Sequence, residues 1–227
     1  MKLLELFCGT KSVGKVAEKL DIDTVSLDIL PKFNPDVCCN IMDFDYTAYP
    51  KGHFDFIWAS PPCTEFSVAK TTGVRDLEGA IKVVEQTLKI IEYLEPKYFC
   101  IENPVGLLRK QECMIPCKQY ETVVSYCKYG FAYRKNTNFW TNVKYNPRRC
   151  LKGSYCEAKE KTGRHMVSVQ NGDHYKNGVK TNQPGVYNLN DRYAIPEAVI
   201  YDILSPAVDF LEAVRSPRGQ SRRGAHA

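Results

Sequence analysis

The chain has 227 residues, of which 44% are hydrophobic, enough for the core of one domain with a small insertion. No apolar run approaches the roughly 18 residues that cross a bilayer, which excludes a membrane-embedded protein. The formal net charge of +5 owes most to the last segment, 215–227, which carries four arginines and no acid. The rest of the chain is close to neutral, so the informative charge is local.

Ten cysteines occur without the dense, regular spacing of a secreted disulfide scaffold. The first residues, MKLLELFCG, are typical of a strand and a glycine turn, and they lack the long apolar core of a signal peptide. We therefore expect an intracellular protein, in the cytoplasm or the nucleus, with reduced thiols. Such thiols are free to act as a nucleophile or to bind a metal ion.

Short strands and helices alternate along the first half of the chain. Strands are predicted at 2–7, 23–29, 53–60 and 98–104, and helices at 16–20 and 77–94. This alternation predicts an α/β fold with a mostly parallel sheet and covering helices.

The regular pattern ends near residue 140. The segment 141–190 is rich in Lys, Asn, Gly, Tyr and Cys, and it is predicted to form an irregular insertion. Helical periodicity returns at 196–214, where Pro206 is expected to interrupt or restart the helix. The basic tail 215–227 is predicted to be disordered.

Candidate functional groups follow the predicted strands, and in parallel α/β sheets ligands bind at the carboxyl ends of strands. These groups are Phe7-Cys8-Gly9-Thr10, Asp28, Ser60-Pro61-Pro62-Cys63 and Glu102-Asn103-Pro104. The glycine turn could let a cofactor approach the backbone, and Asp28 could accept the hydroxyls of a ribose. Alternatively, the turn is structural and the acid is a helix cap or lies in solvent.

The cofactor and the chemistry follow from two further patterns. Neither GxGxxG nor GxxxxGK[ST] occurs, which favours a nucleoside cofactor without a phosphate chain, such as S-adenosylmethionine. Cys63 stands where amino-group methyltransferases place a stacking aromatic residue, and a thiolate can attack C6 of cytosine and activate C5. Glu102 is the candidate carboxylic acid at N3. Outside this pattern, Cys63 would be interpreted as a buried structural thiol.

At this point the sequence resembles the DNA cytosine-5 methyltransferase family, in the compact form that phages and large DNA viruses carry. The matching segments are LFCGTKSVG (6–14), SLDI (26–29), CNIMDFD (39–45), SPPCTEFS (60–67) and IENP (101–104). The resemblance covers roughly 1–145 and 190–205. It implies a Rossmann-like S-adenosylmethionine-dependent methyltransferase fold, acting on double-stranded DNA with the target cytosine flipped out of the stack. We assume a monomer.

The resemblance also implies a division of the chain into four parts. Residues 1–142 form the catalytic domain and 143–189 a reduced target-recognition insertion. Residues 190–214 return to the catalytic domain, and 215–227 form the tail.

The resemblance assigns roles to individual residues. Cys63 is the nucleophile, Glu102 contacts N3 and Asn103 braces the Pro-Cys loop. The expected cofactor site comprises Phe7, Cys8, Gly9, Thr10, Asp28, Ile29, Asn40, Ile41 and Pro61, with Tyr193 and Ala194 closing over it.

One departure from the family pattern concerns its Gln-x-Arg-x-Arg segment. The equivalent stretch here is aligned as Arg134-x-Asn136-x-Asn138. Arg134 is expected to join the catalytic set, and Arg134 and Lys135 could compensate for the missing arginines. The loss of the arginine pair keeps a second hypothesis open, a catalytically weak nucleic-acid-binding protein. An RNA (tRNA) cytosine-5 methyltransferase is a third. Its Cys-Phe-Thr or Thr-Cys signatures do not occur.

The insertion and the residues before it are basic and aromatic, which favours contact with nucleic acid. Lys135, Arg148 and Arg149 are the candidate contacts. The same region contains a possible structural zinc site, formed by Cys150, Cys156 and His165. The fourth ligand could be Cys113, Cys117, Cys127 or His174. The alternative is that these are ordinary reduced thiols.

Overall fold

A computed structural model describes residues 1–159, 165–168, 174–176, 179–181, 186 and 188–215. The strands are β1 (Lys2–Leu6), β2 (Asp23–Asp28), β3 (Val37–Cys38), β4 (Phe56–Ala59), β5 (Tyr98–Pro104), β6 (Glu121–Ser125), β7 (Asn136–Thr141), β8 (His174–Lys176) and β9 (Val179–Thr181). The helices are α1 (Ser12–Lys19), α2 (Leu77–Leu94), α3 (Leu189–Tyr193) and α4 (Glu197–Arg215).

The centre of the molecule is a seven-stranded sheet in the order β3-β2-β1-β4-β5-β7-β6. The first five strands of this order are parallel, and β7 runs antiparallel to both β5 and β6. All four residues of β4, Phe56–Ala59, are buried, as expected for a central strand covered on both faces. The predicted α/β fold with a mostly parallel sheet is therefore confirmed.

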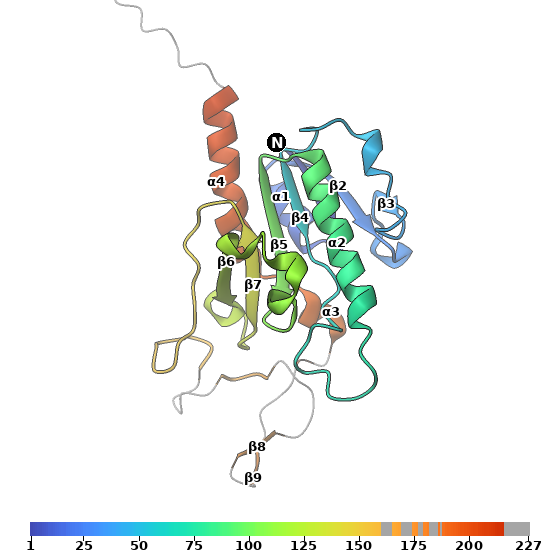
Figure 1. Cartoon of the computed structure of the whole chain (residues 1–227). Coiled ribbons are helices and arrows are strands. Elements are labelled where there is room, and N and C mark those ends of the chain that lie inside the picture. The colour runs from blue at the N-terminus through green and yellow to red at the C-terminus, as the bar shows by residue number, and fades with distance from the viewer. Residues whose placement is uncertain (160–164, 169–173, 177–178, 182–185, 187, 216–227) are drawn as a thin grey trace, which may run out of the picture.

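Helices cover both faces of the sheet (Figure 1). On one face, apolar residues of α1 and α4, such as Val16 and Ile203, pack against Trp58 of β4. On the other face, residues of α2, such as Ile90, pack against Ile57. This arrangement leaves the carboxyl ends of the parallel strands uncovered by the long helices.

Several predicted elements match closely, and others do not. The helix predicted at 77–94 and the strand at 98–104 have the observed bounds of α2 and β5. The sequence did not predict the antiparallel strands β6 and β7. The expected interruption at Pro206 is wrong, because α4 continues through that residue. Buried neighbours such as Ala207 keep this part of the helix packed on the core, which offsets the lost hydrogen bond.

The insertion has little regular structure among its described residues. Its strands β8 and β9 form a small hairpin beyond the carboxyl end of the main sheet (Figure 1). Isolated bridges join Lys159 to His165 and Tyr133 to Val167. The predicted disordered tail, after Arg215, lies outside the described residues.

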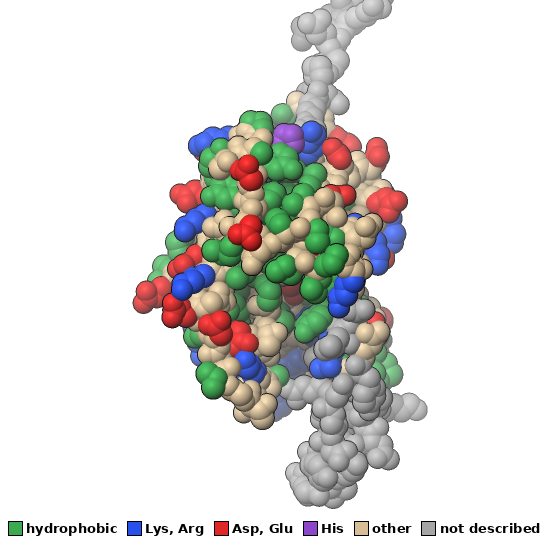
Figure 2. Space-filling view, turned by 90° about the vertical axis from the view of Figure 1, so that its right-hand side faces the viewer, with side chains coloured by type: hydrophobic (Ala, Val, Ile, Leu, Met, Phe, Trp, Pro, Cys, Tyr) green, Lys and Arg blue, Asp and Glu red, His purple; other side chains and the backbone are tan. Residues whose placement is uncertain are grey.

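The surface shows charges of both signs. Figure 2 looks onto the β3 side of the molecule, where hydrophobic side chains fill the middle of the face and acidic and basic ones lie around them. None of the described helices combines the length and apolar character that crossing a membrane requires.

Candidate active site

A cavity of about 560 Å³ lies at the carboxyl ends of β1, β2, β4 and β5. Its volume falls within the range of about 300–1,000 Å³ that small-molecule sites occupy. The predicted site residues that line it are Phe7, Cys8, Gly9, Thr10, Asp28, Ile29, Asn40, Ile41, Pro61, Cys63, Glu102, Lys135 and Tyr193. The fold thus brings the expected cofactor residues and the expected catalytic pair to one space. Ala194 and Asn103 are not among its lining residues.

The turn after β1 is held by the acid that ends β2. Phe7 and Gly9 both have left-handed backbone conformations, with φ of 61° and 47°, which glycine adopts without strain. The Gly9 amide donates to Asp28 Oδ2 at 2.9 Å, and the Leu30 amide donates to Asp28 Oδ1 at 2.8 Å. Asp28 therefore fixes two loops at the rim of the cavity. Each of its oxygens retains a lone pair for a hydroxyl ligand.

Glu5 is a site residue that the sequence analysis did not single out. Its side chain is only 3% exposed, it lines the cavity, and its Oε2 accepts a hydrogen bond from the Gly14 amide at 3.0 Å. Burial raises the pKa of Glu5 to about 8. The available signal was a single acid inside the otherwise apolar strand LLEL.

The Pro-Cys loop is braced by the residues that end β5. Asn103 donates from Nδ2 to the Pro61 carbonyl at 2.9 Å, and the Leu107 amide donates to the Phe66 carbonyl at 2.8 Å. Gly106 makes this approach possible, because a Cβ at that position would lie 2.3 Å from the Phe66 oxygen. These contacts hold the backbone on both sides of Cys63.

The thiol and the carboxyl group of the site influence each other. Burial, and then the negative charge of Glu102, raise the pKa of Cys63, while the positive charge of Lys135 opposes this. Burial also raises the pKa of Glu102, against the charge of Lys135 and a hydrogen bond from Tyr126. Burial thus disfavours the charged form of both groups, and Lys135 opposes this effect at each of them.

Two side chains from the antiparallel part of the sheet surround Glu102. The Tyr126 hydroxyl donates to Glu102 Oε1 at 2.8 Å. Lys135 lines the cavity, its Nζ lies 4.9 Å from the centre of the Tyr126 ring, and it donates to the Arg192 carbonyl at 2.8 Å. Tyr126 is a site residue that the sequence does not reveal, because no local pattern indicates that this residue folds back onto β5.

The structure places Lys135, and not Arg134, at the cavity that holds Cys63 and Glu102. Arg134 is exposed and is not among the residues that line the cavity, whereas Lys135 lines it. In β7, Phe139 lies opposite Glu102, and Thr137 opposite Pro104. Because strand residues alternate between faces, the face of Glu102 receives positions 135, 137 and 139. Asn136 and Asn138, which were aligned with the family's two arginines, therefore lie on the opposite face of the sheet from Glu102.

The segment before α4 closes one side of the cavity. Tyr133 donates from its hydroxyl to the Asp191 carbonyl at 2.8 Å, and Lys135 donates to the next carbonyl along α3. Tyr193 then reaches the cavity wall, although its side chain is 55% exposed. The predicted return of the chain to the site is thus held by residues that directly precede β7.

The basic residues predicted to contact nucleic acid differ in their surroundings. Arg148 pairs with Asp202 of α4 at 2.9 Å and lies 4.1 Å from the centre of the Tyr129 ring. Arg149 is exposed. Arg148 therefore contributes to the junction with α4, whereas the side chain of Arg149 projects towards solvent.

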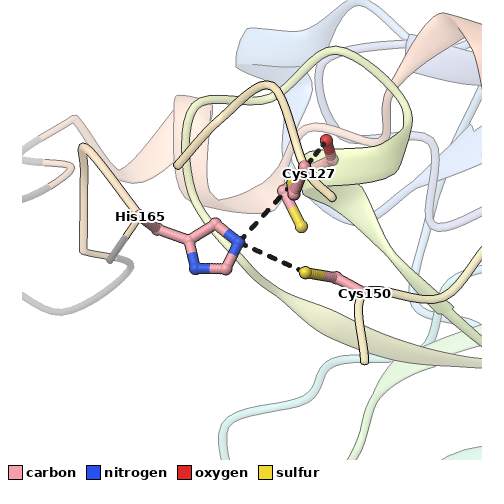
Figure 3. A group of neighbouring side chains, drawn as sticks. Cys127, Cys150 and His165 are labelled. Carbon is pink, nitrogen blue, oxygen red and sulfur yellow. Dashed lines mark hydrogen bonds between the residues drawn. The ribbon is translucent and has the colours of Figure 1, made fainter. Parts of the chain in front are cut away.

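The residues of the predicted metal site also come together. Cys150, Cys156 and His165 lie in one cluster, and Cys127 is the fourth member (Figure 3). Two other candidates, Cys113 and Cys117, pack instead against the core on the α2 face. The His174 side chain lies outside the described atoms.

Comparison with solved structures defines the class of the fold. The Entamoeba histolytica methyltransferase EhMeth aligns with a TM-score of 0.50 and 15% identity, over 66% of this chain and 57% of that chain. This chain thus spans little more than half the length of that structure. The similarity supports a methyltransferase fold.

Comparison of sequences gives the family. Residues 1–129 match the C-5 cytosine-specific DNA methylase family. A probable DNA (cytosine-5)-methyltransferase of Frog virus 3 (isolate Goorha) is 30% identical over 225 residues, which cover 90% of this chain and 99% of that protein. The type II methyltransferase M.AgeI of Thalassovita gelatinovora is 30% identical over 127 residues, 48% of this chain and 29% of that protein. The chain belongs to the C-5 cytosine-specific DNA methylase family, and the predicted class of enzyme is confirmed.

Proposed function

We propose that this protein methylates C5 of cytosine in double-stranded DNA, using S-adenosylmethionine, with Cys63 as the nucleophile and Glu102 as the acid at N3. The observation that carries the proposal is that Cys63, Glu102 and Asp28 line the same cavity. A thiol, a carboxyl group with a raised pKa and an acid suited to a ribose have no common purpose in a protein that only binds nucleic acid.

The residues of the cavity suit S-adenosylmethionine. Asp28 is placed to accept the ribose hydroxyls, and the left-handed turn at Gly9 exposes backbone to the ligand. Phe7, Asn40 and Ile41 supply an apolar and amide surface for the rest of the nucleoside. When bound, the cofactor supplies an electrophilic methyl group.

Cys63 and Glu102 divide the work on the base. The Cys63 thiolate adds to C6 while Glu102 gives a proton to N3, so that C5 becomes nucleophilic and can take the methyl group. A water molecule then takes the C5 proton, the electron pair of that C–H bond re-forms the C5–C6 double bond, the bond between Cys63 and C6 breaks, and Glu102 recovers its proton from N3. The thiolate is regenerated as the leaving group, so the protein ends the cycle unchanged.

Burial, Lys135 and Tyr126 together act on the protonation states that this chemistry requires. Burial raises the pKa of Glu102 and so favours the protonated form that can give a proton to N3, whereas Lys135 and the Tyr126 hydrogen bond lower it. The positive charge of Lys135 also lowers the pKa of Cys63 and favours its thiolate. Once Glu102 is neutral, its repulsion of the thiolate also disappears.

The target base must leave the stack to reach this cavity, since C6 is inaccessible within a duplex. The insertion, 143–189, is proposed to contact the DNA through exposed basic residues such as Arg149. The protein is proposed to act inside the cell, where its ten free cysteines stay reduced.

The test is transfer of labelled methyl groups to duplex DNA of mixed sequence, with tRNA assayed in parallel. Cys63→Ala should abolish transfer to DNA. Cys38→Ser, which changes an exposed thiol outside the cavity, should leave transfer intact. A covalent complex with DNA containing 5-fluorocytosine should form with the natural protein and not with Cys63→Ala, because fluorine cannot leave C5 as a proton does.

Three outcomes would contradict the proposal in different ways. Label on tRNA alone would assign the protein to RNA. Cofactor binding without methyl transfer to either substrate would favour the second hypothesis, a catalytically weak nucleic-acid-binding protein. Transfer that survives in Cys63→Ala would remove the covalent mechanism and leave the class of reaction in place.

A further inference from the structure

Three buried cysteines and a histidine meet beside the end of β6. Cys127, Cys150 and Cys156 are between 4% and 5% exposed, and with Ala158 they form a separate buried cluster that lacks any large apolar side chain. The partly buried His165 completes the group. A buried cluster of this composition gains little from hydrophobic packing, so another interaction is needed to hold this part of the insertion together.

The spacing of the four ligand atoms suits one tetrahedral metal ion. The Nε2 atom of His165 lies 3.5 Å from Cys150 Sγ and 3.8 Å from Cys156 Sγ, and all four ligand atoms lie within 4.8 Å of one another. Bonds of about 2.3 Å to sulfur and about 2.0 Å to nitrogen place neighbouring ligands of tetrahedral zinc about 3.5–3.8 Å apart. Figure 3 shows the His165 ring pointing towards the sulfur of Cys150.

The backbone brings the ligands to this point from the end of β6 and from the insertion. Cys127 lies in the short 3-10 helix Tyr126–Lys128, directly after β6. The Cys150 amide donates to Ser125 Oγ at 3.0 Å, which ties the start of the insertion to the end of β6. His165 is held by its bridge to Lys159 and by the Met166 amide, which donates to the Ala158 carbonyl at 2.9 Å. The ligand set is therefore fixed by the main sheet as well as by the insertion.

We propose that Cys127, Cys150, Cys156 and His165 bind one structural Zn²⁺ ion. Three thiol protons pass to solvent as three sulfur–zinc bonds form, and neutral His165 gives the fourth bond through Nε2. Four protein ligands leave no open position for a substrate, so the ion is structural rather than catalytic. Thiolate and imidazole ligands select zinc over Mg²⁺ or Ca²⁺, which prefer oxygen.

The charge of the site is balanced by nearby basic residues. Three thiolates and one Zn²⁺ ion carry a net charge of −1. Lys159 and Arg134 lie close enough for their positive charges to act on His165, and Lys159 also acts on Cys150.

The zinc site is adjacent in the chain to a residue that contacts the catalytic acid. Cys127 follows Tyr126, whose hydroxyl donates to Glu102. Lys128 donates to the Tyr155 carbonyl at 2.7 Å, which joins the same short helix to the insertion between two ligands. The ion would therefore fix the position of the insertion relative to Tyr126, which contacts the catalytic acid Glu102.

The first experiment measures zinc in the full chain, purified without a polyhistidine tag from zinc-supplemented medium. We expect about one zinc per chain by elemental analysis. Cys156→Ser and His165→Ala should lower this content severalfold, while the matched control Cys38→Ser, at an exposed cysteine, should retain it. Replacement of zinc by Co²⁺ should give the visible absorption of a tetrahedral site with sulfur ligands. None of these measurements depends on methyl transfer.

The proposal is overturned if the natural protein holds far less than one zinc per chain and also fails to give the tetrahedral Co²⁺ spectrum. A disulfide between two of the three cysteines, found under reducing purification, would overturn it as well. If the ligand variants do not fold, titration of the natural protein with a chelator decides the question. Release of zinc with a lowered melting temperature supports the site, and an unchanged melting temperature after zinc removal contradicts its structural role.

Discussion

Lys135 is the residue whose placement most affects the chemistry. It lines the cavity with Cys63 and Glu102, and its charge lowers the pKa of both against the effect of burial. A lysine can provide the positive charge of an arginine without its fixed two-pronged geometry. The protein thus keeps a cation beside the catalytic pair, although it lacks the family's arginine pair.

We predict that Lys135→Gln shifts the pH–rate profile to higher pH. Loss of the positive charge raises the pKa of Cys63, so the thiolate forms only at higher pH, and it raises the pKa of Glu102 in the same direction. Activity at neutral pH should fall at least about tenfold, equivalent to about 1.4 kcal/mol in the barrier. The measurement is kcat/KM against pH.

Two variants control for charge alone. Lys89→Gln removes an exposed charge from α2 and should leave the profile unchanged. Arg134→Gln removes the adjacent charge outside the cavity and should shift the profile less than Lys135→Gln does. A larger effect from Arg134→Gln would contradict the assignment of Lys135 to the face of Glu102.

We predict that Tyr126→Phe lowers kcat and moves the alkaline limb of the profile to higher pH. The lost hydroxyl donates to Glu102 and lowers the pKa of that carboxyl group, so without it Glu102 holds its proton more tightly. Glu102 is a carboxylate while its proton is on N3, and a hydrogen bond to a charged group contributes about 1.5–3 kcal/mol, so kcat should fall by roughly ten- to a hundredfold. Tyr120→Phe, which changes a tyrosine outside the cavity, should show neither effect. An unmoved limb in Tyr126→Phe would mean that the hydroxyl does not act on Glu102.

At the scale of elements, the end of β5 supports the Pro-Cys loop. The loop is held by hydrogen bonds from Asn103 and Leu107, and its backbone passes close to Gly106. The catalytic thiol therefore depends on a strand and a loop that are about 40 residues apart in the chain. Such a contact is decided by packing and not by local propensity.

We predict that Gly106→Ala destabilises the protein and reduces methyl transfer together. The added Cβ would lie 2.3 Å from the Phe66 oxygen, so the loop must move away from β5. Overpacking of this kind costs about 1–3 kcal/mol. Chemical denaturation and transfer assays measure the two effects. Val68→Ala, at an exposed position of the same loop, should change neither strongly, and normal activity in Gly106→Ala would contradict the bracing role.

At the scale of the whole molecule, the C-terminal helix completes the core. Residues of α4 such as Val199 and Ile203 are fully buried with α1 and β4, although they follow the insertion in the chain. The exposed pair Lys19–Glu197 joins the surfaces of α1 and α4 and is expected to contribute little. The core on this face of the sheet is therefore complete only with the last helix in place.

We predict that the stability of the protein falls as the pH rises from about 4.5 to about 8, and that Glu5→Gln removes much of this decline. Folded protein keeps the Glu5 proton up to about pH 8, while the unfolded chain releases it near its ordinary pKa of 4.5. The unfolded state is therefore favoured increasingly across this window, by an amount on the order of several kcal/mol.

The measurement is the free energy of unfolding in urea at a series of pH values. Glu92→Gln, at an exposed acid of α2, serves as the control and should keep the natural pH dependence. An identical decline in Glu5→Gln and the natural protein would show that the buried carboxyl group is not its source.

The sequence by itself determined the parallel half of the fold and most of the cavity wall. The periodic pattern of apolar residues was enough to locate α2 and β5. Groups that follow the strands, such as Asp28 and Cys63, meet in one cavity because parallel strands end at the same edge of the sheet. Tertiary structure alone decided that Lys135 and not Arg134 faces Glu102, because that choice rests on the register between β5 and β7. The same holds for Tyr126 and Cys127, since distant segments reach these residues only when the antiparallel strands pair and the insertion folds against them.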